Sequence, residues 1–205
     1  MKNTEQISSF IMYNYIPFDK KQCIKRLLVI WVTSFILCFI NGPTLPWVLT
    51  IGLTDICLSV ILVSLIVRYS QSQTSRYLCD GFFWLYISVF LNLTAYKIMV
   101  FQGNSNWTLA IVLILSLMVC IFFFILVTLL NIRSGKYSKT NFSKKIVSLP
   151  FFCSAIAVLT ARLSLQGASQ QVALKALAYI LLLLSFVTSV PSINLLKAWF
   201  YKRYL

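Results

Sequence analysis

Long apolar runs separated by short polar stretches dominate the chain. A helix needs about 20 apolar residues to cross about 30 Å of hydrocarbon, and six runs approach or exceed that length. They cover residues 27–41, 44–67, 81–101, 108–131, 146–165 and 172–196. None shows the polar–apolar alternation of a half-buried strand. The pattern therefore predicts an all-α integral membrane protein with six transmembrane helices.

The first run is short, and a chain break follows it. At about 1.5 Å per residue it reaches only about 22 Å, so we expect it to be tilted, thinly inserted or partly re-entrant. Asn41, Gly42 and Pro43 then interrupt the helical pattern, because proline lacks a donor and restricts the residue before it. The first two runs are predicted to form a tight helical hairpin.

The N-terminal segment is amphipathic. Ile7, Phe10, Ile11 and Tyr15 follow helical spacing, and polar residues occupy the other face, which is typical of a helix lying on a membrane surface. We predict such a helix on the cytoplasmic face. It could anchor the first span, or it could bind a substrate, and the sequence leaves both roles open.

Composition and charge set the compartment and the topology. The chain of 205 residues is 60% hydrophobic and only 11% charged, whereas soluble domains carry about a quarter charged residues. Of its 18 Lys and Arg residues, 15 lie before the first run, between the second and third, between the fourth and fifth, or after the sixth. Under the positive-inside rule both termini are cytoplasmic. We expect a multi-pass protein of the cell membrane.

The same arrangement predicts a single membrane domain over residues 1–205. It consists of the amphipathic segment 1–26, a six-helix bundle over 27–196 and a basic tail over 197–205. The lipid bilayer is the expected partner, and nucleic acid is not, because the basic residues are spread over four separate segments. A homodimer is left open, although no GxxxG motif predicts one. With no histidine and four Asp and Glu residues, we expect no metal and no cofactor.

Of the four charged residues inside the predicted spans, Asp55 and Lys97 are the candidates for a substrate or ion path. Asp55 lies near the middle of the second span, and Lys97 lies near the outer end of the third. An intramembrane carboxylate must be paired, hydrated or protonated. Asp55 could accept a hydrogen bond from Ser or Thr as a structural residue, pair with Lys97, or serve a function. The depths fit an ion pair poorly, because the two lie about 17 Å and about 6 Å from the outer ends of their helices.

Cys79 is the candidate nucleophile. The chain has six cysteines and no C-x-x-C motif, so neither a zinc ribbon nor a thioredoxin-like centre is indicated. Cys79 ends the polar loop 68–79, close to Arg76. A partly accessible thiol beside a guanidinium can be acidified into a nucleophile.

The arrangement resembles the accessory gene regulator B (AgrB) family of membrane cysteine endopeptidases, which trim and cyclise peptide pheromone precursors. The similarity rests on the amphipathic opening over 7–15 with the acidic-basic residues 18–21 after it, and on two spans leading to a loop that ends in Cys79. A Lys-rich stretch over 136–145 and the run 184–191 with its closing Pro191 complete it. The resemblance covers most of the chain, and it implies that the membrane is a bacterial plasma membrane.

The resemblance implies catalytic roles around Cys79, but the sequence departs from the family at one of them. In the family a catalytic His stands seven residues before the Cys, and here Ser72 occupies that position. The candidate catalytic set is therefore Cys79, Ser72 and Arg76, in a degenerate member without the His. Losing a positioned general base costs about 10²–10⁴ in rate, so whether this chain is an enzyme stays open.

Three functions remain as alternatives. The first is an AgrB-like protein that binds a short amphipathic peptide precursor at the cytoplasmic face, with processing left open. The second is a non-catalytic transport or substrate-binding subunit, for which Asp55 and Lys97 would mark the path. The third is a peptide-immunity membrane protein.

Overall fold

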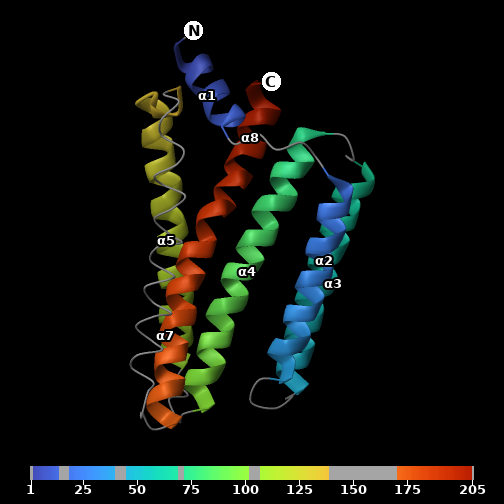
Figure 1. Ribbon diagram of the computed structural model, residues 1–205, viewed down its shortest axis with the longest axis vertical. Helices are drawn as coiled ribbons and strands as arrows, with labels where there is room; N and C mark the ends of the chain where they lie inside the picture. Colours follow the sequence, from blue (N-terminus) through green and yellow to red (C-terminus); the bar gives the residue numbers. More distant parts are fainter. Residues whose placement is uncertain are drawn as a thin grey trace.

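The computed structural model describes residues 2–13, 19–39, 45–68, 72–101, 107–138 and 170–204, and these residues are all-α. Its α-helices are α1 (Lys2–Met12), α2 (Lys20–Phe39), α3 (Leu45–Arg68), α4 (Gln73–Phe101), α5 (Trp107–Arg133), α7 (Gln170–Ser189) and α8 (Asn194–Tyr204). Two 3-10 turns, η1 (Lys136–Ser138) and η2 (Val190–Ile193), follow α5 and α7. The long helices run side by side, and α1 lies at the end where both termini are found (Figure 1).

Four helical stretches are long and apolar enough to cross a membrane: Lys21–Phe39, Gln73–Val100, Thr108–Arg133 and Gln171–Tyr204. They correspond to the predicted first, third, fourth and sixth spans, and they indicate a multi-pass membrane protein. The predicted second span coincides with α3, whose residues Ile51–Ser64 form a shorter apolar stretch. The predicted span 146–165 lies outside the described residues.

Helix α4 organises the bundle, because α7 and α8 pack along one side of it while α2 and α3 pack on another (Figure 1). The helices bury polar as well as apolar residues between them, and many large apolar side chains point outward. On α2 and α5 the exposed residues include Phe35, Val119 and Phe122, each about two-thirds exposed. Such surfaces suit contact with lipid tails, because the tails are as apolar as these side chains.

At both ends of the chain the helix boundaries differ from the predicted segment boundaries. Helix α2 begins at Lys20 and is 20 residues long, so it reaches about 30 Å and the first span is not short. The boundary expected after residue 26 therefore falls inside a helix. At the other end, α8 continues the helical path through residues 197–204, so the expected basic tail is part of the bundle.

The amphipathic prediction for α1 is confirmed as a helix, but its apolar face meets protein. Ile7, Phe10 and Ile11 are buried in a cluster that includes Ile132 of α5 and Phe200 of α8. The fourth residue of the predicted stripe, Tyr15, lies outside the described residues. Helix α1 thus covers the end of the bundle with the face that we expected to meet the membrane.

Candidate functional site

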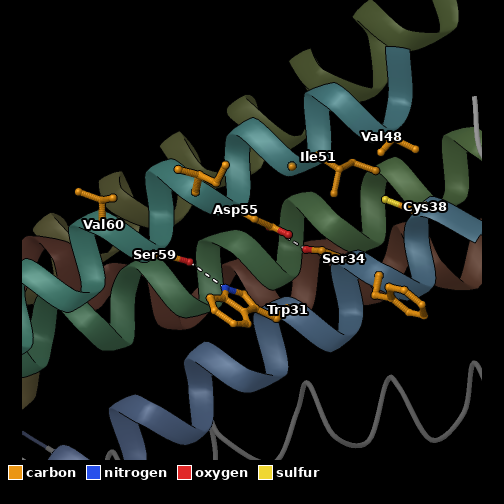
Figure 2. Close-up of a pocket in the computed structure, with 11 residues that line it drawn as sticks. Trp31, Ser34, Cys38, Val48, Ile51, Asp55, Ser59 and Val60 are labelled. Atoms are coloured by element: carbon orange, nitrogen blue, oxygen red, sulfur yellow. Dashed lines mark hydrogen bonds between the residues drawn. The ribbon is translucent and has the colours of Figure 1, made fainter. Parts of the chain in front are cut away.

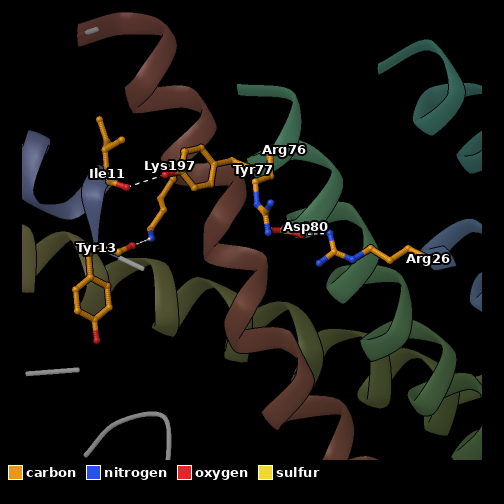
Figure 3. A network of polar contacts seen from close by, with 7 residues as sticks. All are labelled: Ile11, Tyr13, Arg26, Arg76, Tyr77, Asp80 and Lys197. Atoms are coloured by element: carbon orange, nitrogen blue, oxygen red, sulfur yellow. Dashed lines mark hydrogen bonds and ion pairs between the residues drawn. The ribbon is translucent and has the colours of Figure 1, made fainter. Parts of the chain in front are cut away.

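A buried ion-pair cluster joins the first turns of α2 and α4 (Figure 3). Asp80 is 5% exposed and accepts a hydrogen bond from Nη1 of Arg26. Its second oxygen lies 3.4 Å from Nε of Arg76, one helical turn earlier on α4 and 3% exposed. Two guanidinium groups from different helices therefore share one carboxylate, which ties the α2–α3 hairpin to the rest of the bundle.

Cys79 lies next to this cluster, but it is not partly accessible as predicted. Helix α4 begins at Gln73, so the expected polar loop is already helical at Cys79, whose side chain is 1% exposed. Cys23 of α2, itself 4% exposed, belongs to the same buried group of residues. A substrate carbonyl could reach the Cys79 thiol only if α2 and α4 moved apart.

Ser72 and Arg76, the other two candidate catalytic residues, have structural partners. The Oγ of Ser72 accepts the backbone N–H of Ser75 at 3.3 Å, which is the N-cap contact of α4. Arg76 is held by Asp80. The start of α4 brings all three candidates near one another, but each is engaged in holding the fold.

A second polar centre fixes α1 to α8. Lys197 is 5% exposed and its Nζ donates to the carbonyl oxygen of Tyr13 (Figure 3). The same Nζ lies 5.4 Å from the ring centroid of Phe10 and 5.6 Å from that of Tyr77, within cation–π range. Tyr77 in turn donates to the carbonyl of Ile11 at 2.8 Å. These contacts secure the C-terminal turn of α1 to the bundle.

Tyr137 closes this centre from the side of α5. Its ring lies 4.9 Å from that of Phe10, centroid to centroid, and burial raises the pKa of its phenol. Tyr137 thus packs η1 against the same cluster as α1 and α8.

The intramembrane candidates Asp55 and Lys97 do not pair with each other. The Oγ of Ser34 donates to Asp55 at 2.7 Å, which confirms the alternative of a hydrogen bond from Ser or Thr. The Nζ of Lys97 donates to the carbonyl oxygen of Leu37 at 3.0 Å. Over the part of the chain that the structure describes, both ion pairs involve Asp80. The ion-pair alternative for Asp55 is therefore wrong.

Sequence reasoning missed the two residues around which these centres are built. Asp80 had a usable signal, since it is one of only four acidic residues and stands four positions after Arg76, the spacing of an intrahelical ion pair. No sequence signal marks Lys197 as buried, because a lysine after a long apolar run is typical of the start of a solvated tail. Burial of Lys197 depends on α1, which precedes it by most of the chain.

No group of His, Cys, Asp and Glu residues that could hold a metal ion occurs within the described ranges. The sequence matches no protein-family model, no curated protein and no solved structure. The AgrB resemblance accordingly stays a prediction that depends on its motifs.

Proposed function

We propose that the chain is an AgrB-like protein of the bacterial plasma membrane that binds a short amphipathic peptide precursor at its cytoplasmic end without cleaving it through Cys79. The proposal includes six spans with both termini in the cytoplasm. The ligand is the short peptide precursor that the AgrB resemblance implies, and Cys79 has no catalytic role in this proposal.

The observation that carries the proposal is the distribution of exposed basic side chains. The end of the bundle where α2 and α4 begin and α3, α5 and α8 finish (Figure 1) has a basic rim: Lys21, Lys25, Arg133, Lys136, Lys202 and Arg203, all exposed. Exposed acidic residues at this end are fewer, with Glu5 and Asp19 among the described ones. Such a rim attracts the acidic residues of a peptide and steers its approach. The apolar face of the peptide then lies at the membrane–water interface.

Cleavage through Cys79 would require both access to the thiol and a group that accepts its proton. A cysteine peptidase needs a reachable thiolate and a base that accepts the proton. Here the thiol of Cys79 is 1% exposed, the chain has no histidine, and the neighbouring carboxylate of Asp80 is held by two arginines.

Co-expression with any short peptide encoded beside the gene tests the catalytic half. We expect identical peptide masses from cells carrying the wild type, Cys79→Ala or an empty vector. A shorter or cyclised product that appears with the wild type and disappears with Cys79→Ala would overturn this half of the proposal.

Binding is tested on the purified protein in nanodiscs of neutral lipid, which remove attraction to anionic headgroups. The probe is a fluorescent amphipathic peptide with several acidic residues. Replacing Lys136, Lys202 and Arg203 together by Gln should weaken binding about tenfold. Lys175→Gln is the matched control, because this exposed lysine lies near the start of α7 at the opposite end. Equal affinities for the two variants would refute the proposed peptide site.

A further inference from the structure

A groove of about 460 Å³ lies between the second half of α2 and the first two-thirds of α3. Figure 2 shows Asp55 and Ser34 hydrogen-bonded to each other between the two helices, with Trp31 and Ser59 one helical turn further along. Asp55 is about 20 Å from the α3 end nearest the basic rim, at 1.5 Å per residue. The groove is therefore separate from the peptide site proposed above.

The polar wall of the groove is held in place by hydrogen bonds. Ser34 is 2% exposed, contacts the hydroxyl of the buried Tyr86 behind it and donates to Asp55. Trp31 Nε1 donates to Ser59 Oγ at 2.8 Å. The carboxylate of Asp55 is itself only half-buried, so part of it faces the open groove.

The remaining wall is apolar and continuous with the surface that faces lipid. Val48 is 39% exposed, and Ile56 and Val60 are each 63% exposed. Ligand pockets of this size class are mostly apolar with a few fixed polar groups. In such surroundings the Asp55 side chain carries either a proton or a counter-cation, because lipid tails cannot solvate a bare negative charge.

We propose that this groove binds a membrane-partitioning organic cation, with its charge next to Asp55 and its apolar body along Val48, Ile56 and Val60. The ligand enters sideways from the lipid, and Trp31 supplies an aromatic surface at the edge. A bare metal ion fits less well, since the structure brings no group of three potential metal ligands together in the residues that it describes. A lipid tail would fill the apolar part and leave the carboxylate without a counter-charge.

The test uses radiolabelled tetraphenylphosphonium, a hydrophobic cation with a shielded charge, on the protein in phosphatidylcholine nanodiscs. We expect saturable binding to the wild type and a Kd at least tenfold higher for Asp55→Asn. Asp55→Glu, which keeps the charge, should stay within about threefold of the wild type. The neutral triphenylphosphine oxide should compete at least tenfold less well than unlabelled cation.

A second variant separates loss of the site from loss of the fold. Gly52 lines the groove, and a Cβ added there meets no atom within 4 Å, so Gly52→Leu should fill the groove while the protein melts at the wild-type temperature. It should abolish saturable binding although Asp55 is intact. Ser64→Ala is the matched control, because this exposed α3 serine bonds only its own helix.

Non-saturable partitioning in the wild type, or equal binding by wild type, Asp55→Asn and Gly52→Leu, would overturn the inference. Peptide binding at the basic rim should be unchanged in both variants. The two proposals can therefore fail separately.

Discussion

Replacing Asp80 by Asn should destabilise the bundle strongly, although the substitution changes almost no volume. The carboxylate compensates two guanidinium groups: Arg76, which is 3% exposed, and Arg26, whose side chain is 22% exposed. Removing one partner of a buried ion pair costs about 3–5 kcal/mol. Because Arg26 keeps some access to solvent, we expect a loss of about 2–4 kcal/mol at this site.

For a protein of this length, each kcal/mol shifts the melting temperature by about 2–4 °C. Asp80→Asn should therefore lower it by about 5–15 °C, measured in detergent by the fluorescence of the five tryptophans. Asp19→Asn is the control, because the exposed carboxylate of Asp19 accepts only the N–H of Lys21, at 2.9 Å, and Asn can replace it as a cap.

A rescue variant distinguishes the loss of charge compensation from a general packing defect. Replacing Arg26 and Arg76 by Met in the Asp80→Asn background removes the two uncompensated charges, and apolar replacement of a whole buried ion cluster is often neutral or stabilising. We expect at least half of the lost stability to return. A melting temperature within 1 °C of the wild type for Asp80→Asn, or a further fall in the rescue variant, would refute the reasoning.

Two further predictions concern the contacts of α8. Lys197→Met should release α1, so that the backbone amides of α1 exchange hydrogen at least tenfold faster than in the wild type. Lys202→Met, on the exposed face of α8, should leave this exchange unchanged. Equal exchange rates of α1 in the two variants would contradict the docking role of Lys197. Gly81→Ala should cost about 1–3 kcal/mol, because the new Cβ would lie 2.5 Å from the side chain of Leu195 and 2.9 Å from its backbone nitrogen. Gly52→Ala, with open space around it, should melt like the wild type, and equal melting of the two alanine variants would contradict the close packing at Gly81.

The membrane helices could be predicted from the sequence because their signal is local. A run such as Thr108–Arg133 identifies itself by length and hydropathy alone, with no knowledge of its neighbours. The start of α2 was missed for the same reason. Residues 20–26 are mostly polar, so hydropathy does not extend the helix to them, although Asp19 accepts the N–H of Lys21 and begins it.

The candidate site could not be predicted in the same way, because burial of polar residues depends on contacts between distant segments. Cys79 looks accessible when it is read as the end of a polar loop, and it becomes buried only because α2 packs against the first turns of α4. Asp55 shows the opposite case. A hydrogen bond from a Ser or Thr was among the predicted alternatives for Asp55, since few other polar groups lie near a carboxylate within a span.

The contact between Lys197 and Tyr13 joins residues that are 184 positions apart, and this separation orders events during synthesis. At about 5–20 residues per second, α1 leaves the ribosome roughly 10–40 s before the lysine that holds it. During that interval its apolar face has no α8 to cover it. Docking of α1 therefore has to wait until α8 has been synthesised, and only a chain translated through α8 can complete the bundle.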